Sequence, residues 1–158
     1  MTPETISWLA ERMERFKGLD TAELPLVNDF AMLWSFFECT KLECSSSFVE
    51  LGSYVEKKLA ELSTVEVDEY LSFLQQQYVD NGQFTQSFHG LNFPYTPREV
   101  DNALRGENPA LDIKFKACLM ILSRYRHNLF HGEAWLEGVH DNPEVFQQAN
   151  GFLKEIMR

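Results

Sequence analysis

The sequence predicts an all-α protein, a bundle of four or five helices with an irregular insertion between the fourth helix and a long central helix. Three observations predict this fold. Apolar residues recur at steps of three and four through most of the chain, as on one face of a helix. No segment shows a sustained two-residue alternation or hairpin turns, and there is no internal repeat. A length of 158 residues fits a single domain, which we expect to span residues 1–158.

The first four helices follow from apolar spacing and from residues that begin or end helices. We expect the first over Thr2–Gly18, because a threonine cap and a proline precede an apolar stripe that a glycine ends. The second should run over about Ala22–Cys44, or begin at Leu24, since the proline that follows fits only in a first turn. The third should cover about 48–62 and the fourth about 66–79.

Residues 81–108 form the only long stretch without apolar periodicity. A short helix is expected inside it, because Thr96-Pro97-Arg98-Glu99 has the form of a capping box with proline at the first position. The aromatic residues of this insertion could stack nucleic-acid bases, but such aromatics more often pin a loop to its own domain. We favour the second interpretation for the four of them: Phe84, Phe88, Phe93 and Tyr95.

The longest apolar stripe predicts a central helix from Asn108-Pro109 to Gly132. Its middle is apolar nearly all round, so it lies either at the centre of the bundle or with a second face against another subunit. After a loop, Asp141-Asn142-Pro143 should cap a final helix that carries apolar residues as far as Ile156.

The net charge of −10 opposes RNA binding, because contacts to phosphate draw on Lys and Arg. The charge is unevenly distributed, however. Residues 109–132 hold four basic residues and one acidic residue, which gives +3 there and −13 elsewhere: Lys114, Lys116, Arg124 and Arg126 against Asp112.

No apolar run approaches the roughly 20 residues of a membrane helix, and the amino terminus lacks the regions of a signal peptide. We therefore expect a cytoplasmic protein that does not enter a membrane. The three cysteines form no CxxC pair, and we expect them to be reduced, buried thiols: Cys39, Cys44 and Cys118.

Polar residues are concentrated where the central stripe ends, in Arg124-Tyr125-Arg126-His127-Asn128-Leu129-Phe130-His131-Gly132. The segment from Arg126 to His131 has the form Arg, a polar residue, three more residues, then His. It resembles the Arg-x(4–6)-His signature of HEPN domains, the all-helical ribonucleases of toxin, phage-defence and CRISPR-associated systems. The family version Arg-Asn-Asn-Leu-Phe-His-Gly differs only in that His127 replaces the first Asn, a position where the family accepts Asn, Asp or His.

The resemblance implies a metal-independent endoribonuclease without a cofactor, whose products end in a 2′,3′-cyclic phosphate. Such an enzyme needs a proton-transfer group, here His131, and a cation on the phosphate, here Arg126. His127 and Asn128 would position the substrate or set the imidazole tautomer. Arg124 is followed by a core tyrosine, so we expect a peripheral phosphate contact or an interface residue. A carboxylate of the second helix, Glu38, either lies in water or points inward and orients a motif side chain.

Helix geometry places Arg126 and His131 about 140° apart, so one regular helix would not direct both at one phosphate. Either the helix loosens near Gly132 or two chains combine their motifs. The resemblance implies the second, and we expect a homodimer with the motif at its interface. Arg124, His127 and His131 share one face, which could form the dimer surface.

Two other interpretations remain. The spacing of His127 and His131 is that of a helical metal pair, but the sequence shows no clear third ligand. Alternatively the motif is structural, with Arg126 paired to Glu38, and the protein is an inactive helical binding or dimerisation module. For the enzyme we expect RNA, but not DNA, as substrate, and an antitoxin or regulatory protein as a further partner.

Overall fold

The computed structural model describes residues 2–12, 24–45, 47–61, 64–131 and 143–158. This part of the chain is mostly helical, which confirms the all-α prediction. In chain order its elements are α1 (Pro3–Arg12), α2 (Leu24–Lys41), α3 (Phe48–Lys58), α4 (Thr64–Tyr78), β1 (Val79–Asp80), β2 (Gln83–Phe84), α5 (Gln86–His89), α6 (Arg98–Arg105), α7 (Leu111–His131) and α9 (Pro143–Ile156).

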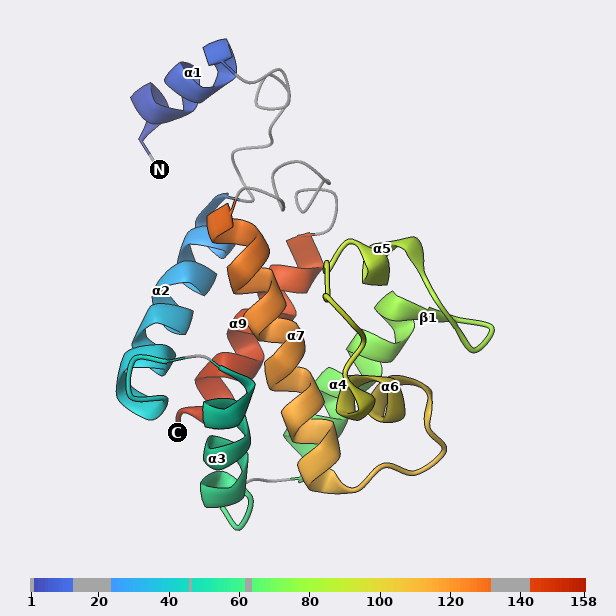
Figure 1. Ribbon diagram of the computed structural model, residues 1–158. Coiled ribbons are helices and arrows are strands. Elements are labelled where there is room, and N and C mark those ends of the chain that lie inside the picture. The colour runs from blue at the N-terminus through green and yellow to red at the C-terminus, as the bar shows by residue number, and fades with distance from the viewer. Residues whose placement is uncertain (1, 13–23, 46, 62–63, 132–142) are drawn as a thin grey trace.

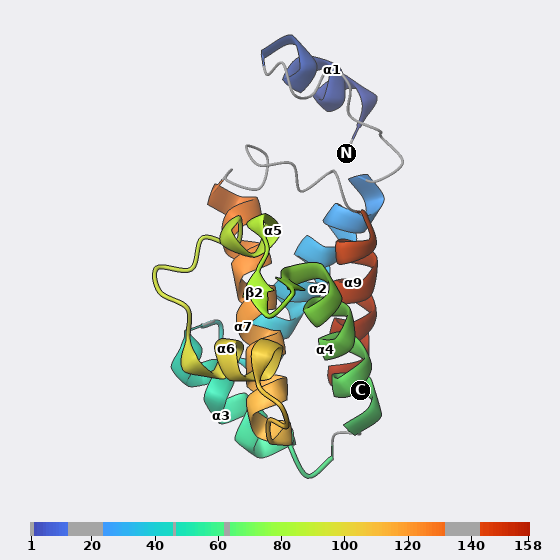
Figure 2. The ribbon, with the colours of Figure 1, turned by 90° about the vertical axis from the view of Figure 1, so that its right-hand side faces the viewer.

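Helix α7 runs through the middle of the bundle, with α3, α4 and α6 packed against it, while α2 and α9 pack against each other (Figures 1 and 2). Residues 117–122, in the middle of α7, are each at most 3% exposed. This burial occurs within one chain. The all-round apolar character of α7 is therefore explained by its central place, and it does not require a second subunit. In both views α1 stands apart from the bundle.

Three buried tyrosine hydroxyls form hydrogen bonds inside the core. The hydroxyl oxygens of Tyr78 and Tyr125 lie 2.6 Å apart, which ties α4 to α7, and Tyr54 donates to the carbonyl oxygen of Ile156 at 2.7 Å. Burial raises the pKa of Tyr54 to about 12 and also raises the pKa of Tyr78 and of Tyr125. Each hydroxyl therefore stays protonated and able to donate over the ordinary pH range.

The insertion is folded onto α4 and α7, and its phenylalanines belong to the core or pack against it. Phe88 is buried, and its ring centre lies 3.8 Å from that of Phe84 and 5.8 Å from that of Phe93. Both of these rings are stacked on the Phe88 ring. The prediction that these residues pin the loop to its own domain is confirmed for the three phenylalanines. It is wrong for Tyr95, whose side chain is 71% exposed.

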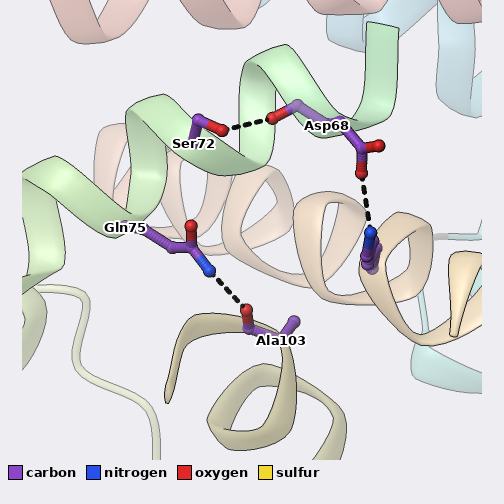
Figure 3. A network of polar contacts seen from close by, with 5 residues as sticks. Asp68, Ser72, Gln75 and Ala103 are labelled. Atoms are coloured by element: carbon purple, nitrogen blue, oxygen red, sulfur yellow. Dashed lines mark hydrogen bonds and ion pairs between the residues drawn. The ribbon is translucent and has the colours of Figure 1, made fainter. Parts of the chain in front are cut away.

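Helix α6 of the insertion forms where the sequence predicts a short helix, but its cap differs. Pro97 is the N-cap and makes no side-chain cap, while Glu99 accepts from Lys116 of α7 at 2.7 Å. The capping-box prediction is therefore wrong, because a tertiary ion pair takes the carboxylate. Gln75 of α4 donates to the carbonyl oxygen of Ala103 at 3.0 Å and so connects α4 to α6 (Figure 3).

A hairpin whose strands are two residues long follows α4, where the sequence predicted no hairpin turn. Val79 pairs with Phe84 and Asp80 with Gln83, so Asn81-Gly82 forms the turn. Both turn residues have positive φ, 49° and 76°, which is the backbone that an Asn-Gly turn adopts. The strands are only two residues long, too short for an alternating pattern, which explains why the periodicity did not predict them.

The predicted helices agree with the structure except at their ends. Helix α2 begins at Leu24, as the proline rule allows, and α7 ends at His131, next to the predicted stop. Residues 13–18 of the first predicted helix and the loop after α7 lie outside the described residues. Among the described helices none is both long enough and apolar enough to cross a membrane.

The prediction of three buried cysteines is wrong for two of them. Cys118 is buried in the middle of α7, but Cys39 and Cys44 are exposed at the end of α2. Cys39 lies on an exposed face of α2 and Cys44 lies in the turn after the helix, so neither thiol packs against the core.

Candidate functional site

The motif occupies the last turns of α7, which is regular helix as far as His131. The helix does not loosen before that residue, and Gly132 lies outside the described residues. Arg126 and His131 therefore keep the angular separation of about 140° that five helical steps give. Within one chain, α7 directs these two side chains to different sides of the helix.

Arg126 faces α2. Its Nη2 lies 3.6 Å from Oε2 of Glu38, and the same carboxylate oxygen accepts from Trp34 Nε1 at 3.2 Å. The Glu38 side chain is only 17% exposed and lies beside Arg126, as the inward-pointing interpretation predicts, and its role in orienting a motif side chain stays a prediction. Because Arg126 is 34% exposed, we expect the pair to contribute no more than about 1 kcal/mol to stability.

The guanidinium of Arg126 has donors that Glu38 does not use. Its Nε is buried, and no hydrogen-bond partner for it lies within the part of the chain that the structure describes. An arginine carries five N–H donors, and a buried donor without a partner costs about 1–3 kcal/mol. The guanidinium also lies 5.4 Å from the centre of the exposed Phe130 ring. Arg126 is thus oriented by its neighbours while retaining the capacity to bind an anion.

Arg124 and Asn128 hold the insertion. Arg124 donates from Nε to the carbonyl oxygen of Leu91 at 2.8 Å and from Nη2 to that of Asn92 at 2.6 Å. Asn128, only 4% exposed, donates to the carbonyl oxygen of Gly90 at 2.9 Å, and its Oδ1 lies 3.4 Å from Arg124 Nη2. These contacts fix a turn in which Asn92 has a φ of 53°. A contact of either residue with substrate stays a prediction.

His127 and His131 lie one turn apart, and their ring centres are 4.2 Å from each other. His131 is exposed and His127 is partly buried. In the described residues no group of three or more His, Cys, Asp or Glu side chains is placed to hold a metal ion. His140 lies outside them.

One cavity joins the motif to the start of α3. It has a volume of about 200 Å³ and is lined by Ser47, Phe48, Ser123, Arg124, Arg126 and His127. Ser47 is the N-cap of α3, with its Oγ accepting from the Glu50 backbone at 3.4 Å. The N-terminal end of a helix carries a partial positive charge, so the cavity combines that end with two guanidinium groups, an imidazole and two hydroxyls. This set is suited to an anion of the size of a phosphate.

Ser47 is a site residue that was not predicted from the sequence, where the three serines before α3 indicated only a break between helices. A serine before an apolar run, with an acidic residue three positions later, is nevertheless typical of an N-cap. The sequence could not predict that Ser47 lies beside the motif, because Ser47 and Arg126 are far apart in the sequence and only the fold brings them together.

Ion pairs reduce the positive charge of residues 109–132. Lys114 lies 2.9 Å from Asp68 on α4, Lys116 lies 2.7 Å from Glu99, and Arg126 pairs with Glu38. Three of the four basic residues of this range are therefore paired with acidic side chains of other elements, which offsets the charge of +3 counted from the sequence.

Searches against protein-family models, curated proteins and solved structures found no match to this chain. The likeness to HEPN domains rests on the motif at the end of α7 and stays a prediction.

Proposed function

We propose that this protein is a metal-independent endoribonuclease, acting in the cytoplasm as part of a toxin or phage-defence system. The observation that carries the proposal is the cavity that Arg126 and His127 line together at the start of α3. The cavity brings a cation, a proton-transfer group and hydroxyl groups together, and the proposed reaction uses no metal.

The proposed reaction is attack of a ribose 2′-oxygen on the adjacent phosphorus. A base removes the 2′-proton, the new P–O bond forms, the bond from phosphorus to the 5′-oxygen breaks, and an acid protonates that oxygen. The products are a 2′,3′-cyclic phosphate and a 5′-hydroxyl. Arg126 stabilises the charge that grows on the phosphate, using guanidinium donors that Glu38 does not engage. Histidine transfers the protons, because its pKa lies near the working pH.

The proposed enzyme is a homodimer whose sites are shared between chains. A regular α7 keeps His131 away from the Arg126 of its own chain, so the partner subunit's His131 completes the site. The exposed Phe130, beside His131, supplies an apolar contact at this end of α7. The enzyme would be held in check by an antitoxin or a regulatory protein.

The test is cleavage of single-stranded RNA and of DNA of the same sequence, with and without EDTA. RNA should be cut equally in both conditions, with cyclic phosphate ends, and DNA should stay intact because it has no 2′-hydroxyl. Loss of cleavage in EDTA would indicate the alternative metal pair of His127 and His131. DNA cleavage would rule out attack by the 2′-oxygen.

A second candidate is an inactive helical binding or dimerisation module, favoured by the Arg126–Glu38 ion pair and by the structural bonds of Arg124 and Asn128. The single substitutions Glu38→Gln and Arg126→Ala, together with the double variant, separate the candidates. In a module the two changes should be coupled in unfolding free energy, and the native chain should cut no RNA. In the enzyme Arg126→Ala should remove cleavage with a stability loss no greater than about 1 kcal/mol.

A further inference from the structure

Two exposed thiols lie in contact at the end of α2. Cys39 is in the last turn of the helix and Cys44 is in the turn that follows, with their sulfur atoms 3.5 Å apart. Buried cysteines usually serve as small apolar side chains, as Cys118 does in α7. Packing does not account for Cys39 and Cys44 in this way, because both are exposed.

The backbone after α2 is folded so that Cys44 returns over Cys39. The carbonyl oxygen of Glu38 accepts from the amides of Leu42 at 3.2 Å and of Cys44 at 3.0 Å, which closes the helix. Glu43 and Cys44 have φ values of 52° and 62°, in the left-handed region that favours glycine. Each such residue costs on the order of 1–2 kcal/mol. Neither position is occupied by glycine, and the second is one of the two touching thiols.

We propose that Cys39 and Cys44 are a redox-modification site that closes reversibly to an intrachain disulfide. The oxidant is a hydroperoxide, and hydrogen peroxide is the simplest member of that class. This proposal rests on the thiol geometry alone and stands whether or not the protein cleaves RNA.

The chemistry balances in two steps. The Cys39 sulfur, after losing its proton, attacks one peroxide oxygen, the O–O bond breaks, and the departing oxygen leaves as water after protonation. Cys44 then attacks the sulfenic sulfur of Cys39, the S–S bond forms, the S–O bond breaks, and a second water leaves. Two thiols lose two electrons and two protons, and one peroxide becomes two waters. A dithiol such as dithiothreitol reverses the net change by exchange.

The order of the steps follows from the contact between the thiols. Cys44 donates its S–H to the sulfur of Cys39, and this bond raises the pKa of Cys44. Cys44 thus keeps its proton more tightly than an ordinary thiol, and Cys39 is the sulfur that meets the oxidant. Closure brings the two sulfurs from 3.5 Å to about 2.05 Å, a short movement for an exposed turn.

In the sequence, the two cysteines lie between the residue that pairs with Arg126 and a residue that lines the cavity. Glu38, which pairs with Arg126, immediately precedes Cys39, and Ser47, which lines the cavity, lies three residues after Cys44. Closing the bridge constrains the segment that joins them. An exposed bridge in a tight turn is of the reducible kind, since strain and access both favour exchange.

The test uses the full chain, reduced, freed of reductant and treated with hydrogen peroxide. Alkylation under denaturing conditions should fall from three thiols to one, with an intact mass lower by two hydrogens and with dithiothreitol restoring both thiols. Trypsin cuts after Lys41, between the two cysteines, so the bridge should appear as one linked pair of peptides.

Three variants complete the experiment. Cys118→Ala should keep the bridge, while Cys39→Ser and Cys44→Ser should each abolish it. The proposal is overturned if peroxide leaves three alkylatable thiols, gives only bridges between chains, or converts Cys39 to sulfinic acid while Cys44 stays free. Because the linked peptides are measured on the native chain, these outcomes hold even if a variant fails to fold.

Discussion

Arg126 and Glu38 face each other across α7 and α2, with Nη2 and Oε2 3.6 Å apart. This separation allows ionic attraction but exceeds the 2.7–2.9 Å of a good charge-assisted hydrogen bond. The carboxylate meanwhile accepts from Trp34. Glu38 therefore orients the guanidinium without using up its donors, and Arg126 and Arg124 are expected to respond differently to substitution.

Arg126→Ala should abolish RNA cleavage with little loss of stability. Arg124→Ala should instead destabilise the fold and leave most of the cleavage rate. Removing a donor directed at transition-state charge costs about 10² to 10³ in rate. Arg124 instead makes two charge-assisted bonds to the carbonyl groups of Leu91 and Asn92, and losing them should cost about 2–3 kcal/mol. Single-turnover rates and urea unfolding of both variants measure the two effects.

The matched control is Arg98→Ala, which removes an exposed arginine at the start of α6 and should change neither quantity. Arg126→Lys should recover part of the binding but little of the rate, because lysine lacks the planar fork. If Arg124→Ala lost more cleavage rate than Arg126→Ala at temperatures where both are folded, the assignment of the catalytic arginine would be wrong.

Mixing two inactive variants tests whether the proposed site is shared between chains. Arg126→Ala and His131→Ala should each be inactive alone. Because a mixed dimer contains one site with the native Arg126 and the partner subunit's His131, an equimolar mixture should recover about a quarter of the native activity. Activity that stays absent in a mixture shown to contain mixed dimers would place both residues in one chain.

The amphipathic pattern was enough to predict the longer helices, and it marked the middle of α7 as apolar nearly all round, but it did not predict the short helix α5. It could not predict the pairing of helices. The contact of Ser47 with the motif depends on how α3 meets α7, and the use of Arg124 by the insertion depends on where residues 90–92 fold.

The local sequence also did not predict which polar groups would pair with residues far away in the chain. Glu99 had the spacing of a capping residue, yet its carboxylate accepts a hydrogen bond from Lys116 of α7. Cys39 and Cys44 looked unrelated, because no motif marks a pair five residues apart. Two left-handed residues bring them together, and the sequence contains no glycine at either position to announce that turn.

Phe130→Ser should weaken the proposed dimer. Phe130 is 61% exposed next to His131, and burying such a ring at an interface contributes on the order of 2 kcal/mol, so the dissociation constant should rise by more than tenfold. Phe36→Ser is the matched control, because Phe36 is 59% exposed on α2 and is given no role at the interface. Sedimentation across a concentration series measures both. A native chain that stays monomeric at micromolar concentration would contradict the dimer, as would an equal effect of the two variants.

Raising the pH above 10 should destabilise the fold, and Tyr54 should account for a measurable share of the loss. Its hydroxyl donates to the Ile156 carbonyl, and burial raises its pKa to about 12, against about 10 in the unfolded chain. Below pH 10 both states keep the proton, and the stabilisation is fully present. As the pH rises toward 12, the unfolded state loses the proton first, so the unfolding free energy falls by on the order of 2 kcal/mol.

Tyr54→Phe should be less stable at neutral pH by about 1 kcal/mol, the value of one hydrogen bond, but its unfolding free energy should decline less steeply above pH 10. Tyr95→Phe, at an exposed position, should follow the native curve. Urea unfolding at several pH values between about 8 and 11.5 gives these slopes, and a native and a Tyr54→Phe curve that run parallel would show that Tyr54 titrates alike in both states.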